Sequence, residues 1–129
     1  MDGAKELPKV LVVDDDPDLA ALCSMLLESE GYDTDIARNG FEAYEVISSE
    51  HVDVVLLDAM MPVLDGLTVC RMVKRDPDLR DVPIILMSAS RRLCDEARGS
   101  ADAVINKPFD LDNLVNTVRH FAYPQQIYP

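Results

Sequence analysis

Short apolar segments alternate with amphipathic segments five times along the chain. The most apolar segments, at 10–13, 52–57 and 83–87, have almost no polar positions. Such segments are typical of strands that are buried on both faces of a parallel sheet. By the same criterion, 34–37 and 101–105 are predicted to be weaker strands.

An amphipathic segment follows each predicted strand. The first has a capping carboxylate at Asp16, a proline at the first helical position, Pro17, and a stop signal at Gly31. Helices are predicted at 17–30, 41–49, 66–76, 91–98 and 111–121. The residues expected to pack on the sheet are Leu19, Leu22 and Leu26; Ala43, Val46 and Ile47; Leu67, Cys70 and Val73; and Leu111, Leu114, Val115, Val118 and Phe121.

Regular alternation of strand and helix predicts an α/β fold with a doubly wound, five-stranded parallel sheet covered on both faces. We expect one domain at 9–122, an extension at 1–8, and a tail or linker at 123–129. Ligands of such folds bind beyond the carboxyl ends of the strands.

The charge of the chain narrows the possible partners. The 129 residues carry a formal net charge of −12, which disfavours direct contact with nucleic acid or an anionic membrane. The start lacks the apolar core of a signal peptide, and no apolar segment is long enough to span a membrane. Three cysteines, Cys23, Cys70 and Cys94, have no metal-binding or disulfide spacing, so a cytoplasmic location is expected.

Polar residues gather at the predicted strand ends. Asp14, Asp15 and Asp16 follow the first strand, Asp58 the third, Ser88 the fourth, and Asn106 and Lys107 the fifth. Clustered carboxylates repel one another unless a cation neutralises them, and oxygen ligands of this charge suit Mg²⁺. A lysine beside the ion suits a phosphoryl group. No catalytic base is evident near Asp58, so its carboxylate is the plausible nucleophile.

Each residue also has a simpler interpretation. Asp16 is most simply a helix cap, Ser88 an ordinary loop serine, and Lys107 a surface charge. Their joint placement at one sheet edge favours a site for all but Asp16. His51 and His120 are isolated, and no chemistry is assigned to them.

The sequence closely resembles the receiver domains of bacterial two-component response regulators, the CheY-like family. The segments that carry the resemblance are VLVVDDDP at 10–17, VVLLDAMMPVLDG at 54–66, PIILMSAS at 83–90 and ADAVINKPF at 101–109. The resemblance covers 9–122 and implies the strand order 2-1-3-4-5.

The resemblance also implies roles for individual residues. Asp58 would be the phosphoacceptor, with Ser88 as switch hydroxyl and Lys107 as phosphoryl partner. Mg²⁺ would bind Asp15, Asp58 and the backbone carbonyl of Met60, with Asp14 assisting through water. Lys107-Pro108 would be a cis peptide. A histidine kinase or phosphotransfer protein would supply the phosphoryl group, and a downstream effector or fused domain would respond; a weak homodimer is left open.

Two positions depart from the family pattern. Val104 occupies a place that is usually aromatic, three residues before the lysine. Lys107 follows Ser88 by 19 positions, about three fewer than usual, which predicts a short fourth helix. Both changes touch the face that many family members use for dimerisation, so we expect an altered readout.

Other classes fit the sequence less well. A phosphatase of the haloacid dehalogenase type would need an aspartate where Met60 stands. A flavodoxin-like protein that binds FMN would offer hydroxyls and amides to the phosphate in its first loop. Here that loop contains Asp14, Asp15 and Asp16, which would repel a phosphate. The main alternative is a pseudo-receiver, a protein-interaction module that signals without phosphorylation.

Overall fold

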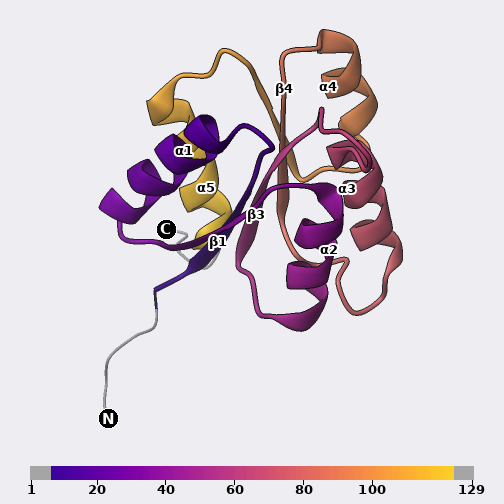
Figure 1. Ribbon diagram of the computed structural model, residues 1–129, viewed down its shortest axis with the longest axis horizontal. Helices are drawn as coiled ribbons and strands as arrows, with labels where there is room; N and C mark the ends of the chain where they lie inside the picture. Colours follow the sequence, from indigo (N-terminus) through magenta and orange to yellow (C-terminus); the bar gives the residue numbers. More distant parts are fainter. Residues whose placement is uncertain (1–6, 124–129) are drawn as a thin grey trace, which may run out of the picture.

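The described part of the chain folds into one parallel sheet flanked by helices on both faces. Residues 7–123 are described by the computed structural model (Figure 1). The strands stand in the order β2-β1-β3-β4-β5, which confirms the predicted topology. The strands are β1 (Lys9–Val13), β2 (Asp33–Ala37), β3 (Val54–Asp58), β4 (Ile84–Ser88) and β5 (Ala103–Asn106).

Within residues 7–123, five helices connect and follow the strands. They are α1 (Pro17–Ser29), α2 (Gly40–Ser49), α3 (Gly66–Arg75), α4 (Arg91–Ala97) and α5 (Leu111–Ala122). Helices α1 and α5 cover one face of the sheet, and α2, α3 and α4 cover the other (Figure 1).

Two separate hydrophobic cores result from the alternation of side chains along the strands. In β3, Leu56 points to the core beneath α1 and α5, whereas Leu57 points to the core beneath α2, α3 and α4. Both side chains are completely buried. The sheet therefore divides the interior into two layers of packing.

The ends of α1 follow the sequence signals. The side chain of Asp16 accepts hydrogen bonds from the backbone N–H groups of Asp18 and Leu19, at 3.0 and 3.3 Å. Gly31 has a φ of +98°, a conformation that favours glycine and ends the helix. The prediction that Asp16 caps this helix is confirmed.

Two leucines that were expected to pack on the sheet are exposed, which corrects the predicted stripes. Leu22 in α1 is 51% exposed and Leu111 in α5 is 46% exposed. The buried row of α1 runs instead through Ala20, Cys23 and Leu27. Each member of the predicted row in α1 directly precedes a member of the buried row along the sequence, so the prediction was displaced by one residue around the helix.

The predicted strand starts at 52 and 101 are each two residues early. Val52 is buried but precedes β3, and the backbone N–H of Asp102 donates to the carbonyl of Ile84 before β5 begins. The chain thus enters the sheet through short connections whose composition resembles that of a strand.

Helix α4 has seven residues and is the shortest helix of the described part, as the spacing predicted. The Lys107-Pro108 peptide is cis, as the family resemblance implied. Among residues 7–123, no helix is long and apolar enough to cross a membrane. Most of the expected extension and tail lies outside the described residues, so the domain limits stay predictions.

Candidate functional site

Three carboxylates meet where β1 and β3 end side by side. Val13 and Leu57 are partners in the register of the two strands. Asp14 and Asp15 follow β1, and Asp58 is the last residue of β3. One oxygen from each of the three carboxylates lies within 4.8 Å of the others.

Asp14 is the most confined member of this cluster. Only 2% of its surface is exposed, and its Oδ1 accepts a hydrogen bond of 2.9 Å from the backbone N–H of Asp16. Its Oδ2 is buried and has no hydrogen-bond partner among the described residues. Burial raises the pKa of the Asp14 carboxyl above its usual value, and the hydrogen bond from Asp16 opposes this only in part.

Lys107 brings a positive charge to the same place. Its Nζ lies 3.3 Å from Oδ1 of Asp58 and 3.8 Å from Oδ2 of Asp14. The backbone N–H of Lys107 donates to the carbonyl of Ser88 at 2.9 Å, which holds this residue at the end of β4. The lysine is thus placed by the sheet itself rather than by a free loop.

Ser88 ends β4, on the strand next to β3. It is 1% exposed, and its Oγ accepts a hydrogen bond of 3.0 Å from the backbone N–H of Ser90. Ser90 in turn caps α4, because its Oγ accepts from the backbone N–H of Leu93 at 3.2 Å. The hydroxyl at the strand end is therefore connected to the start of the short helix.

Met60 is placed by Asp58. Its backbone N–H donates to Oδ1 of Asp58 at 3.3 Å, while its side chain is 62% exposed. Asn106, the remaining polar residue at this edge, turns away, since its Oδ1 accepts from the thiol of Cys94 at 2.8 Å. His51 lies before β3, at the other end of the strand, and pairs with Asp53 at 3.0 Å.

Gly66 is a structural part of the site that sequence reasoning treated only as a helix start. A Cβ on this residue would overlap the backbone carbonyl of Asp58. Its N–H donates to the carbonyl of Ala59 at 3.0 Å, so the first turn of α3 lies directly against the end of β3. The available signal was the glycine that follows the capping residue Asp65.

The acidic cluster fits a hard divalent cation. Its donors are all oxygens, as Mg²⁺ prefers. The partnerless Oδ2 of Asp14 is a buried acceptor that a cation or a cation-bound water would satisfy. The distances among the three carboxylates leave room for one shared ion.

The sheet order and the acidic edge define a doubly wound fold of the CheY type with a site beyond its central strands. The model of the response regulator receiver domain matches residues 10–119, and the chain belongs to this family. The family consists of signalling domains of two-component systems, which work through phosphorylation and interact with histidine kinases and effector domains.

Individual relatives agree with this assignment. The chain is 34% identical over 116 residues to the DNA-binding dual master transcriptional regulator RpaA of Synechocystis sp., covering 88% of this chain and 48% of RpaA. It therefore spans about half the length of that relative.

Solved structures of receiver domains superpose closely. The receiver domain of the Francisella response regulator 1452 is 33% identical, with a TM-score of 0.84 over 92% of this chain and 99% of that one. Response regulator TrrA of Thermotoga maritima, solved in complex with Mg²⁺ and BeF, is 34% identical, with a TM-score of 0.82 over 89% and 99%.

Proposed function

We propose that this chain is a phosphorylation-activated switch of a two-component phosphorelay, which accepts a phosphoryl group on Asp58 in a Mg²⁺-dependent reaction. The observation that carries the proposal is the environment of Asp58. It is a nearly buried carboxylate with a lysine ammonium at 3.3 Å and two more carboxylates within 4.8 Å. A cationic partner and a cation site on one nucleophile are what phosphoryl transfer requires.

The chemistry is a single displacement at phosphorus. A carboxylate oxygen of Asp58 forms a bond to the phosphorus of a phosphohistidine, and the bond from phosphorus to the imidazole nitrogen breaks with its electron pair left on the imidazole. Lys107 supplies positive charge to a phosphoryl oxygen, and the hydroxyl of Ser88 donates a hydrogen bond to another. The products are an acyl phosphate on Asp58 and a free histidine on the donor.

The metal ligands follow from the same residues. Asp15, Asp58 and the backbone carbonyl of Met60 would hold Mg²⁺ directly, with Asp14 bound through water. The ion would neutralise charge on the transferring phosphoryl group and on the carboxylates. The buried Asp14 would hold that water, and its hydrogen bond from the backbone N–H of Asp16 keeps the loop after β1 in place.

The partners that fit this function are proteins. The donor is a histidine kinase or a phosphotransfer protein, and the output is a downstream effector or a domain of the same polypeptide. The chain assists only its own phosphorylation and dephosphorylation. Its net charge of −12 opposes direct nucleic-acid binding and membrane association, and we place it in the cytoplasm.

The alternative, a pseudo-receiver that acts without phosphorylation, is favoured by the altered face around α4. That helix has only seven residues, and Val104 stands in β5 where the family usually has an aromatic residue. The pair of Asp58 and Lys107 opposes this alternative, because a module without phosphoryl chemistry has no need of it.

Intact-mass spectrometry after incubation with Mg²⁺ and acetyl phosphate tests the proposal. The parent is expected to gain one phosphoryl group that mild base removes, and Asp58→Asn is expected to gain none. Asp16→Asn is the matched control, because asparagine is an equally good helix cap and Asp16 lies outside the cluster of three carboxylates. An unmodified parent, with acetyl phosphate and with a phosphohistidine donor, would support the pseudo-receiver instead.

Mg²⁺ binding provides a second test. Titration followed by tyrosine fluorescence or calorimetry is expected to show binding to the parent and much weaker binding to Asp15→Asn and Asp58→Asn. Equal affinity in all three proteins would place the ion elsewhere.

A further inference from the structure

A groove runs between α3 and α4 on the face opposite α1 and α5. It consists of two adjoining hollows of about 650 and 540 Å³, and Arg71 lines both. The larger hollow begins at the loop after β3, and the smaller one ends at the turn between α4 and β5. We call this feature the α3–α4 groove.

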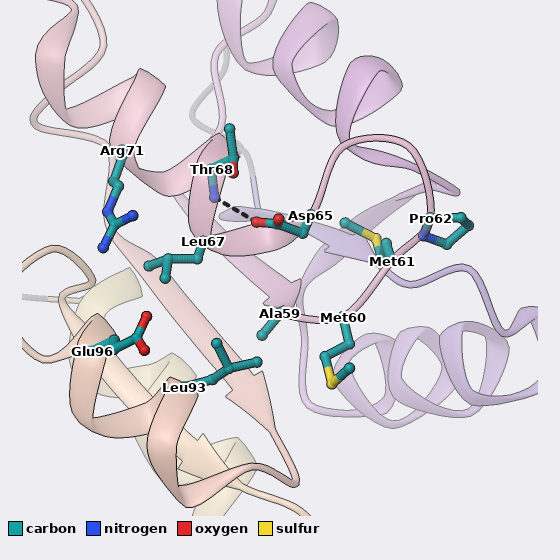
Figure 2. A pocket seen from close by; sticks show the side chains of 10 residues that line it. All are labelled: Ala59, Met60, Met61, Pro62, Asp65, Leu67, Thr68, Arg71, Leu93 and Glu96. Carbon is teal, nitrogen blue, oxygen red and sulfur yellow. Dashed lines mark hydrogen bonds between the residues drawn. The ribbon is translucent and has the colours of Figure 1, made fainter.

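The larger hollow has an apolar floor. Leu67 of α3 and Leu93 of α4 line it from opposite sides, with Ala59 and Met60 at the end nearest Asp58 (Figure 2). The side chain of Met60 is 62% exposed. A flexible, exposed methionine beside an apolar hollow is typical of surfaces that adapt to a partner side chain.

The other end of the groove is basic, in a chain whose net charge is −12. Arg71, Arg75 and Arg80 are exposed there, and none of them forms an ion pair within residues 7–123. Lys74 is already paired with Asp102 at 2.7 Å. Three arginines thus line the groove without an ion-pair partner in the described part of the chain.

The acidic residues of the larger hollow are, by contrast, already engaged. Asp65 caps α3 by accepting from the backbone N–H of Thr68 at 2.8 Å (Figure 2). Glu96 accepts from Arg92 at 3.2 Å. Four basic and three acidic residues line the two hollows together, so the groove as a whole carries an excess of positive charge.

The groove is bonded to the site at the sheet edge in two places. At the end of the groove, the backbone N–H of Met60 donates to Asp58. On the α4 wall, Ser88 accepts from Ser90, which caps α4 just before Leu93. A change at Asp58 or Ser88 would thus reach the end and the α4 wall of the groove.

We infer that the α3–α4 groove binds an acidic segment of a partner protein, with an apolar side chain between Leu67 and Leu93 and carboxylates against Arg71, Arg75 and Arg80. Carboxylates pair with arginine through two parallel hydrogen bonds, and a central apolar anchor with a charged rim is the usual arrangement of a protein-binding site. The binding surface goes beyond the proposed phosphorylation and does not require it.

The charge pattern selects this occupant over others. A nucleic acid would meet three arginines but be repelled by the remaining acidic surface. A short peptide segment contacts only the groove and avoids that field, which is screened beyond about 10 Å at ordinary salt.

The test is an unbiased selection of random peptides displayed on phage against the full chain. The selected sequences are expected to combine aspartate or glutamate with one large apolar residue. A labelled synthetic peptide of the commonest selected sequence is then titrated by fluorescence anisotropy.

Four variants decide the location. Arg71→Glu and Arg75→Glu are expected to weaken binding at least about tenfold by replacing attraction with repulsion, and Thr68→Tyr to weaken it by filling the hollow. Arg91→Glu is the matched control, since Arg91 is exposed on α4 but lines neither hollow, and it is expected to stay within about twofold. Unchanged unfolding midpoints confirm that the variants are folded.

Three results would overturn the inference. The first is a set of selected peptides without acidic residues. The second is equal peptide binding by the parent, Arg71→Glu and Thr68→Tyr. The third is that Arg71→Glu abolishes binding of an oligonucleotide or self-association of the chain, which sedimentation of the parent and the variant, with and without an oligonucleotide, would reveal. Because the anisotropy assay uses unphosphorylated protein, its outcome is independent of whether Asp58 accepts a phosphoryl group.

Discussion

The α-carbon of Gly66 lies against the backbone carbonyl of Asp58, so that α3 begins in contact with the last residue of β3. The contact is with backbone, which cannot move aside as a flexible side chain would. The close approach of helix α3 to the candidate phosphoacceptor is therefore possible only because residue 66 has no side chain.

Replacing Gly66 by alanine is expected to destabilise the fold by about 1–3 kcal/mol or more, because the added methyl group overlaps the carbonyl of Asp58. Urea denaturation measures the change in the free energy of unfolding. Gly99→Ala is the control, since nothing lies within 4 Å of its Cβ position, and it is expected to change stability by less than about 0.5 kcal/mol. Equal effects of the two substitutions would contradict the close contact.

Asp14→Asn is expected to stabilise the metal-free protein at neutral pH. Burial raises the pKa of this carboxyl above its ordinary value of 3.8, so the folded state holds the proton more tightly than the unfolded chain does. In the parent, the protonated carboxyl contributes its full stability below pH 3.8, and this contribution is lost as the pH rises through the pKa of the folded state. The stability of Asp14→Asn relative to the parent should therefore increase across that pH range.

Urea denaturation in the presence of a chelator, at several pH values, measures this difference. The two proteins should converge below the ordinary pKa, where the parent is protonated in both states. Mg²⁺ should then raise the midpoint of the parent more than that of the variant. A variant less stable than the parent at neutral pH without metal would show that burial is not the dominant influence on Asp14.

Val63→Asn is expected to stabilise the protein by roughly 1 kcal/mol. Val63 has a φ of +72°, which a β-branched residue adopts only with strain and which asparagine tolerates. Its side chain is 86% exposed, so the substitution loses little packing. The midpoint of thermal unfolding measures the gain; a lower midpoint would mean that Val63 makes a compensating contact.

The thiols of Cys23 and Cys70 are expected to react slowly in the folded protein. Burial raises the pKa of each to about 11, so almost no thiolate is present at pH 8. The rate is measured from the absorbance of the chromophore that an aromatic disulfide reagent releases when it reacts with a thiol. The control is the same protein in urea, where all cysteines should react rapidly, and equally fast reaction in both states would contradict the burial.

The parallel strands could be predicted from sequence because strands buried on both faces leave continuous apolar segments, whereas their order followed from the family resemblance. The segments at 10–13 and 83–87 show this, and each lies within one residue of the observed strand. The strand starts at 52 and 101 were less accurate, because Val52 is buried in a connection as deeply as in a strand.

The candidate site could be predicted because parallel strands end at one edge, so Asp14 and Asp58 had to become neighbours once the order of β1 and β3 was known. The tight approach of Gly66 and the left-handed backbone of Val63 could not, since both depend on the path of the loop between β3 and α3. The α3–α4 groove depends on the spacing of two helices, which no periodicity in the sequence encodes.

The division of the interior by the sheet has a consequence for how substitutions combine. Leu27 of α1 and Ile47 of α2 belong to different cores and share no packing neighbours in them. Truncations at distant sites of this kind sum in free energy, whereas pairs within one core, such as Leu27 with Leu114, are coupled. The two sides of the sheet are therefore separate packing problems: a cavity on one side can be refilled only by neighbours on that side, whereas a stabilising substitution on either side offsets the lost free energy.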